Sequence, residues 1–215
     1  MKRQTFIVWF LIFIVWAFYR SKIALPEKID EFIVKPLIFV VPPLFLVWVW
    51  ENKKLKELGL SFEVKKFLTD LYIGVVLGII LAVEGLMANY LKYRRFSFEP
   101  VDAVIIAGGI GSFLLINLVT AVSEEILGRG FLYGRLYKAT KKQLWSAMIA
   151  SFLFMLLHFP IMFTRLHLTG SALLFYPLSI FLMGVTNSYL YTLRGNLLLP
   201  ILLHAFWNMT VSLYL

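Results

Sequence analysis

The sequence predicts an all-α fold, a polytopic transmembrane helical bundle of about seven spans (six to eight). Hydrophobic residues make up 60% of the 215 residues, whereas about 45–50% is usual for a soluble chain. They are arranged in runs close to the roughly 20 residues that cross a bilayer as a helix. Lysine and arginine gather in the short segments between those runs, as membrane topology requires. We therefore expect residues 1–215 to form a single integral-membrane domain in a lipid bilayer.

Seven apolar runs define the expected spans. In chain order they cover about 5–19, 32–50, 70–91, 101–123, 142–163, 171–193 and 197–215. The first run follows the basic start Met1-Lys2-Arg3, and no small-residue cleavage site comes after it. We therefore expect an uncleaved first helix and not a signal peptide.

The second and fourth runs carry features that disturb a regular helix. The second run contains Lys35, Pro36 and the pair Pro42-Pro43, so we expect it to be kinked or to form two half-helices. Lys35 lies near the start of this run, and we expect its side chain to extend to the membrane interface. Beyond the fourth run, residues 124–141 could continue the span or turn along the interface, because three glycines there permit a bend.

The distribution of basic residues indicates the orientation of the bundle. More lysines and arginines lie in the segments on the side of the N-terminus than in those on the opposite side. Positively charged loops stay in the cytoplasm, so we expect the N-terminus to be cytoplasmic. We also expect a polar cavity that opens toward the cytoplasm.

Two features of composition exclude classes of function. The chain contains no cysteine, which excludes disulfides, thiolate metal ligands and a cysteine nucleophile. The net charge of +9 would suggest nucleic acid as a partner of a soluble protein. Here the positive charges lie in short loops between apolar runs and form no basic stripe, so we expect no binding of nucleic acid.

Polar groups inside the apolar runs are the strongest indication of function. An ionisable side chain at bilayer depth costs about 2.5–3.5 kcal/mol even on the lenient insertion scale, and such groups usually face one another or a wet cavity. This chain holds three such sets, which are Glu124-Glu125 with Arg129, Phe154 with His158, and His204 with Asn208. A carboxylate pair, two imidazoles and an amide from three helices could together hydrolyse a bond.

The acidic set predicts a base and its support. Glu125 and Arg129 are spaced i,i+4, the spacing of a helical ion pair. Glu124 points roughly 100° away around the helix, and Gly128 one turn on leaves space beside its carboxylate. A carboxylate isolated in a dry pocket could accept a proton from water, so Glu124 is the candidate general base. Alternatively, both glutamates could end the span at the interface and bind water.

The two histidine sets have functional and structural interpretations. Phe154 lies one turn before His158 on the same face, and Pro160 bends the helix beside it. His158 could equally be a core residue bonded to the backbone. His204 and Asn208 could donate hydrogen bonds to an oxyanion, His204 could bind a metal, or both could join helices. The remaining polar residues inside the spans could line the cavity or join helices, and we favour helix–helix contacts; they are Glu84, Asn117 and Asn187.

The ordered set of motifs resembles the CPBP intramembrane proteases. This family includes the CAAX prenyl endopeptidases of the type called Rce and the bacterial Abi proteins. The resemblance covers about residues 100–215 and rests on E-E-x-x-x-R from Glu124 to Arg129, F-x-x-x-H from Phe154 to His158, and H-x-x-x-N from His204 to Asn208. Gly128 departs from the pattern, because many members have an aromatic residue at its position.

The resemblance implies an endopeptidase that works inside the membrane. By this analogy Glu124 activates the attacking water, His158 helps to orient it, and His204 and Asn208 stabilise the oxyanion. Arg129 holds the acidic segment through Glu125. Glu124, His158 and His204 could instead form a zinc site with one open position, although the chain has no H-E-x-x-H helix. We favour a glutamate mechanism without metal, because Asn208 beside His204 suits an oxyanion donor.

The expected function is hydrolysis of a peptide bond in a membrane-associated peptide or protein substrate, such as a prenylated CAAX-type protein. The expected location is a prokaryotic plasma membrane. Two alternatives stay open. The first is a catalytically inactive bacteriocin-immunity or scaffold protein that keeps the site without the activity. The second is a small transporter in which the buried polar groups form an ion path, although the chain shows no repeated halves.

Overall fold

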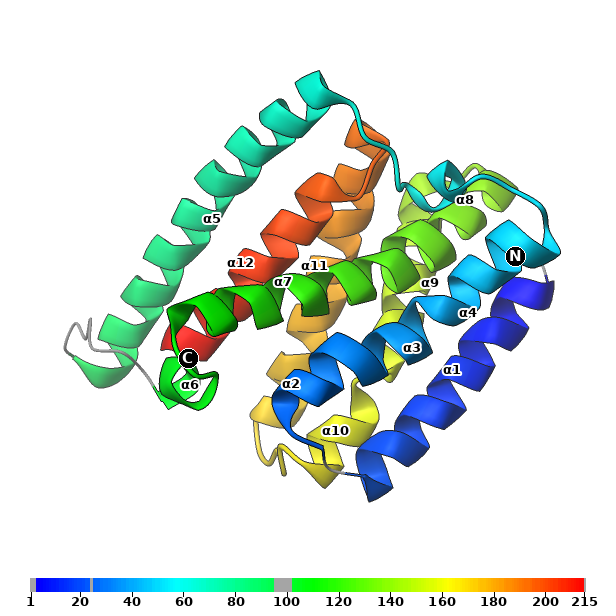
Figure 1. Ribbon diagram of the computed structural model, residues 1–215. Coiled ribbons are helices and arrows are strands. Elements are labelled where there is room, and N and C mark those ends of the chain that lie inside the picture. The colour runs from blue at the N-terminus through cyan, green and yellow to red at the C-terminus, as the bar shows by residue number, and fades with distance from the viewer. Residues whose placement is uncertain (1–2, 24, 95–101, 215) are drawn as a thin grey trace.

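The computed structural model describes residues 3–23, 25–94 and 102–214. Every regular element in these residues is a helix, which confirms the predicted all-α fold (Figure 1). Six helices in the described residues are long and apolar enough to cross a membrane, and the last helix is apolar but shorter. The number of spans therefore falls within the predicted range.

The first three spans occupy the N-terminal part of the chain. The first is α1 (Arg3–Lys22). The second is an uninterrupted helical run from Glu27 to Trp50, and the third is α5 (Val64–Tyr93), which follows the short η3 (Leu55–Leu58). The second run consists of α2 (Glu27–Ile29), η1 (Asp30–Val34), α3 (Lys35–Phe39), α4 (Val41–Leu44) and η2 (Phe45–Trp50).

The remaining spans carry the candidate residues. A short α6 (Asp102–Ile106) precedes the fourth span, which is made of α7 (Ile110–Glu125), η4 (Ile126–Tyr133) and α8 (Gly134–Thr140). The fifth span is α9 (Gln143–Leu156) with α10 (Phe159–Thr164). The last two helices are α11 (Ala172–Arg194) and α12 (Leu198–Tyr214).

The structure differs from the sequence prediction at the start of the fourth span, and it shows how the second run accommodates its prolines. The predicted fourth span of 101–123 was wrong at its start, because Gly108 and Gly109 have φ angles of +83° and +107° and end the helical geometry after α6. The span instead runs on through residues 124–140, so this segment continues the helix and does not turn along the interface. The second run is irregular but not split. Pro36 and Pro42 lie at the second positions of α3 and α4, within the first turn, where a missing N–H is tolerated.

The helices pack so that α12 has neighbours on several sides. It contacts α5, α7 and α11, while α9 packs against α11, and α1 packs against α3 and α10. Figure 1 shows α5 at one edge of the bundle beside α12 and α1 at the opposite edge. The central position of α12 brings the predicted His204 into the interior of the protein.

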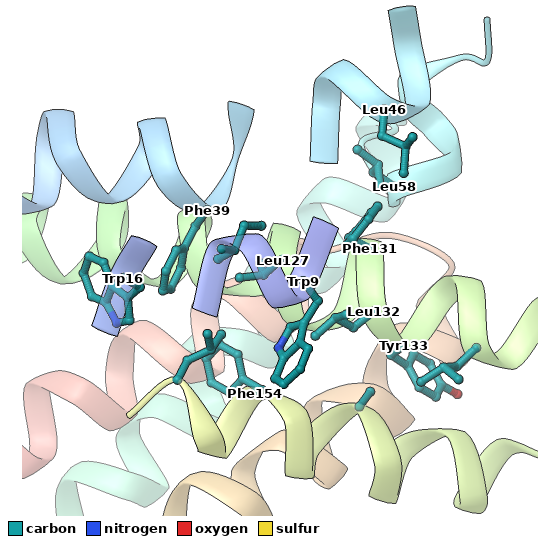
Figure 2. Close-up of a cluster of buried hydrophobic side chains, with 14 of the residues drawn as sticks. Trp9, Trp16, Phe39, Leu46, Leu58, Leu127, Phe131, Leu132, Tyr133 and Phe154 are labelled. Carbon is teal, nitrogen blue, oxygen red and sulfur yellow. The ribbon is translucent and has the colours of Figure 1, made fainter. Parts of the chain in front are cut away.

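An aromatic core joins the N-terminal spans to the fourth and fifth spans. Trp9 and Trp16 on one face of α1 pack with Phe39, with residues of η4 and with Phe154 of α9 (Figure 2). The rings of Trp16 and Phe39 lie 4.7 Å apart between centroids. Each such residue buries a large apolar area that contributes strongly to stability. The first two spans are therefore part of the same core as the helices that carry the candidate site.

Polar contacts fasten the end of the bundle where the N-terminus lies. Arg135 of α8 donates to Thr5 Oγ1 of α1 at 2.8 Å and to Glu51 Oε2 at 3.1 Å. The hydrogen bonds from Arg135, with a further one from Lys53, lower the pKa of Glu51 from its ordinary value of 4.5 to about 2. The first, second and fourth spans are thus joined at this end as well as through the aromatic core.

Close packing at Gly130 generates a prediction for stability. A Cβ atom at this position would lie 2.4 Å from the backbone oxygen of Leu58, which cannot move without displacing η3. Overpacking of this kind costs about 1–3 kcal/mol. We expect Gly130→Ala to lower the Tm of the purified protein in detergent. Gly111→Ala in the same span is the matched control, because nothing lies within 4 Å of its Cβ position. Equal Tm values for the two variants would contradict the close contact.

Candidate active site

A cavity of about 280 Å³ lies between the first two spans and the C-terminal helices. Side chains from all three predicted sets line it, namely Glu124, Phe154, His158, His204 and Asn208. Residues of α1, of the second run and of α11 complete its wall. The structure therefore brings the predicted polar residues from α7, the α9–α10 segment and α12 to one place.

The carboxylate of Glu124 lies at the centre of this arrangement. Its Oε2 atom is 3.5 Å from His204 Nε2 and 3.7 Å from His158 Nε2. Only 6% of Glu124 is exposed, so the carboxylate does not face bulk solvent or lipid, as it would if it merely ended a span at the interface. A water molecule bound to Oε2 would be within reach of both imidazoles.

Glu125 orients the ring of His204. Glu125 Oε1 lies 2.6 Å from His204 Nδ1, and it also accepts a hydrogen bond from Asn187 Nδ2 at 2.9 Å. Arg129 forms the predicted i,i+4 ion pair with the same oxygen at 2.9 Å. A carboxylate can only accept a hydrogen bond, so Nδ1 of His204 is the donor and carries a proton. The other ring nitrogen, Nε2, then points toward Glu124.

The bend in the fifth span orients His158. α9 ends at Leu156 and α10 begins at Phe159, with Pro160 in its first turn, so the predicted bend is present at His158. The Nδ1 atom of His158 lies 3.2 Å from the carbonyl oxygen of Phe154. A carbonyl is also an acceptor, so this ring too directs Nε2 toward Glu124.

Phe154 and Gly128 support the acidic segment in a way the sequence did not indicate. The guanidinium carbon of Arg129 lies 4.9 Å from the centroid of the Phe154 ring, within the range of a cation–π contact. A Cβ atom at Gly128 would come within 3.3 Å of the same ring. Gly128 thus makes room for Phe154, whereas the sequence suggested that it leaves space beside Glu124.

A comparison with protein families adds to this geometry. Residues 106–210 match the family described as type II CAAX prenyl endopeptidase Rce1-like. Over these residues the chain is similar to this family. The match confirms the resemblance seen in the sequence, and it covers just under half of the chain, including every residue of the three polar sets. No curated protein and no solved structure matches the chain significantly.

This match supports a coarse class of function. The family is one of CAAX-type proteases, which are hydrolases that act on membrane-associated proteins. The apolar helices agree with a multi-pass membrane protein. Residues 3–105, which include the first three spans, lie outside the matched region.

Lys35 is the main site residue that sequence reasoning missed. It was expected to extend to the interface, but it is only 4% exposed, and its Nζ lies 3.0 Å from Glu124 Oε1. Glu124 is therefore not the isolated carboxylate that the sequence suggested. The available signal was the lysine itself, because a charge inside an apolar span needs a partner in the bundle.

The other polar residues inside the spans lie in different surroundings. Asn187 joins helices as expected, since it donates to Glu125 and to the carbonyl oxygen of Pro200 at 3.2 Å. Asn117 lines the cavity and donates to the carbonyl oxygen of Phe113 at 2.8 Å. Glu84 is exposed on α5 and is not part of the cavity wall.

The surroundings of Glu124 bear on whether the site could hold a metal ion. Across residues 3–23, 25–94 and 102–214, no three His, Asp or Glu side chains are arranged to hold a metal. The Lys35 ammonium beside Glu124 Oε1 also places a positive charge where a bound cation would be repelled. Glu124, His158 and His204 nevertheless lie close together, with Glu124 Oε2 3.5 Å and 3.7 Å from the two Nε2 atoms, and the zinc site considered from the sequence stays a prediction.

The cavity opens at the end of the bundle opposite the N-terminus. The exposed members of its wall are Glu27 at the start of the second run and Val211 and Ser212 near the end of α12. Figure 1 shows α2 and the C-terminus at one end of the bundle and the N-terminus at the other. A cytoplasmic N-terminus and a cavity open to the cytoplasm were both expected, and this geometry makes the two incompatible.

Proposed function

We propose that this protein is an intramembrane endopeptidase in which Glu124 activates water to hydrolyse a peptide bond. The observation that carries the proposal is the placement of Glu124 Oε2 within 3.5 Å and 3.7 Å of two imidazole Nε2 atoms in a cavity wall. The similarity of residues 106–210 to the Rce1-like family supports the reaction class. The substrate is a membrane-associated peptide or protein, of which prenylated CAAX-type chains are the first candidates.

In the proposed reaction Glu124 removes one proton from the attacking water. The water oxygen bonds to the carbonyl carbon of the scissile peptide, and the carbonyl oxygen becomes an oxyanion. His158 orients the water through Nε2. The C–N bond then breaks, and Glu124 returns its proton to the leaving amine, so the carboxylate is regenerated.

Asn208 and His204 are proposed to stabilise the oxyanion. Asn208 lies one turn after His204 on the same helix and lines the same cavity, and its amide can donate a hydrogen bond to a developing negative charge. Glu125 holds Nδ1 of His204. It therefore holds the ring with Nε2 toward the cavity, as a buried carboxylate orients the histidine of a catalytic triad.

We propose that the reaction needs no metal. The pairing of Lys35 with Glu124 Oε1 supports this, because the ammonium already supplies positive charge at the carboxylate.

The proposed location is a prokaryotic plasma membrane with the N-terminus in the cytoplasm. The excess of lysine and arginine at the N-terminal end supports this orientation. The cavity then opens toward the outer face, so a substrate enters from that side.

The first prediction concerns Glu124. With purified protein in detergent, we expect cleavage of a farnesylated CAAX-type peptide or of unmodified hydrophobic peptides, measured by mass spectrometry. Glu124→Gln should lower kcat by about 10²–10⁴-fold, the usual contribution of a general base. Glu84→Gln is the matched control, because this carboxylate lies in a span but outside the cavity, and its activity should equal wild type. Absence of cleavage by the wild-type protein would favour the inactive immunity or scaffold alternative.

The second prediction concerns metal dependence. Treatment with EDTA or 1,10-phenanthroline should leave kcat/KM unchanged, because no residue in the proposed mechanism depends on a bound ion. Elemental analysis of the purified protein should find zinc well below one atom per chain. Loss of activity on chelation, restored by added Zn²⁺, would replace the proposed mechanism with a metal-dependent one.

The third prediction concerns orientation. Because the chain has no cysteine, single cysteines report on position without background. In intact cells, a membrane-impermeant maleimide should label Ser212→Cys at the cavity rim. It should not label Ser61→Cys, which lies in an exposed loop between η3 and α5, until the cells are lysed. The reverse pattern would place the N-terminus outside and the cavity opening in the cytoplasm.

A further inference from the structure

Buried charged side chains from the second run, which lies outside the region matched by the family, contact Glu124. Lys35 of α3 lies between two carboxylates, with Nζ 3.0 Å from Glu124 Oε1 and 2.5 Å from Glu31 Oε2. All three side chains are at least nine-tenths buried by residue, and all three line the cavity. The helix pair that holds them, η1–α3 and α7, is in direct contact.

The position of Lys35 is fixed from the side away from Glu124. Glu31 Oε2 also accepts a hydrogen bond from Thr120 Oγ1 at 2.6 Å, and Thr120 precedes Glu124 by one turn of α7. Glu31 Oε1 lies 3.6 Å from Arg20, which pairs with Asp30 and covers the Trp16 ring at 4.2 Å. The ammonium therefore cannot leave Glu124 without breaking a network that joins three spans.

The two oxygens of Glu124 have different partners. Lys35 binds Oε1, and this contact turns Oε2 toward the Nε2 atoms of His158 and His204. A free carboxylate could rotate about its last bond, so that neither oxygen faced the imidazoles. The ion pair holds the plane of the carboxylate in one orientation, and catalysis depends strongly on such orientation.

Stability alone does not account for a lysine at this position. Burying an ammonium costs several kcal/mol, and replacing a buried ion pair by apolar residues often leaves a protein equally stable. Lys35 also faces the cavity and not only its two partners. These features distinguish it from Arg129, which lies behind the site and outside the cavity wall.

We infer that Lys35 is a positioning residue for the hydrolysis proposed above, and that the second span supplies it to a site otherwise built from the matched region. The inference rests on the proposed function. It assigns a role in the reaction to α3. This helix lies outside the family match, which begins at residue 106.

The test compares kcat and KM in Lys35→Met and Lys35→Arg. Lys35→Met should lower kcat by about 10²-fold, the cost of a small misplacement of a reacting group, with KM nearly unchanged. Lys35→Arg should recover part of the loss, because the guanidinium also binds Oε1. Ethylamine added to Lys35→Ala should raise its kcat. Lys28→Met, an exposed lysine in the same run, is the matched control and should behave as wild type.

The outcomes separate this inference from the proposed function. If wild type cleaves and Glu124→Gln does not, but Lys35→Met keeps its kcat, the assignment of Lys35 is overturned and the protease stands. A higher KM with kcat intact would also overturn it and make Lys35 a substrate contact. Absence of cleavage by wild type would overturn the proposed function.

A second experiment measures thermal unfolding, so it does not depend on activity and can be applied to variants of low stability. In a double-mutant cycle on thermal unfolding, Lys35→Met with Glu124→Gln should lower Tm by less than the sum of the two single changes. Additive losses would overturn the contact on which the inference rests. If Lys35→Met alone does not fold, the double variant Glu31→Gln with Lys35→Met takes its place, because it removes a buried carboxylate together with the ammonium.

Discussion

The interaction on which the rest of this structure depends is the set of bonds to one buried oxygen, Oε1 of Glu125. Arg129, Asn187 and His204 all bind it, and they come from the fourth, sixth and seventh spans. A carboxylate with no exposed surface requires such partners, because the membrane interior offers no water to replace them. The same bonds that make the charge tolerable also fix the ring of His204, so the stability of the bundle and the geometry of the site have one origin.

The site is built by two parts of the chain that contribute differently. The matched region supplies the acid, the imidazoles and the amide on α7, the α9–α10 segment and α12. The N-terminal spans supply the opposite wall through Trp16 and Phe39 and a cation through Lys35. The aromatic core holds the two parts together, because Phe154 belongs to the same cluster as Trp9 and Trp16 of α1 (Figure 2) and also contacts Arg129.

Much of the fold and of the candidate site could be predicted from the sequence because it depends on local spacing. Apolar run length gave the spans, and i,i+4 spacing gave the Glu125–Arg129 pair. The contact between Lys35 and Glu124 could not be predicted, since it joins residues 89 positions apart and depends on how two helices pack. The start of the fourth span was missed because hydropathy does not report the positive φ angles of Gly108 and Gly109. The side of the cavity opening depends on which ends of seven helices diverge, and no local pattern records this.

The composite wall has a consequence for how proteins of this architecture diversify. The residues proposed to carry out the chemistry lie in a segment of about 105 positions, whereas one wall of the cavity belongs to α1 and to the second run. Exchange of those two helices would reshape the pocket while leaving the reacting groups intact. Substrate selectivity and reactivity can thus change through different parts of the sequence. Any replacement of the two N-terminal helices would have to keep the buried ion pairs that link Arg20, Glu31 and Lys35.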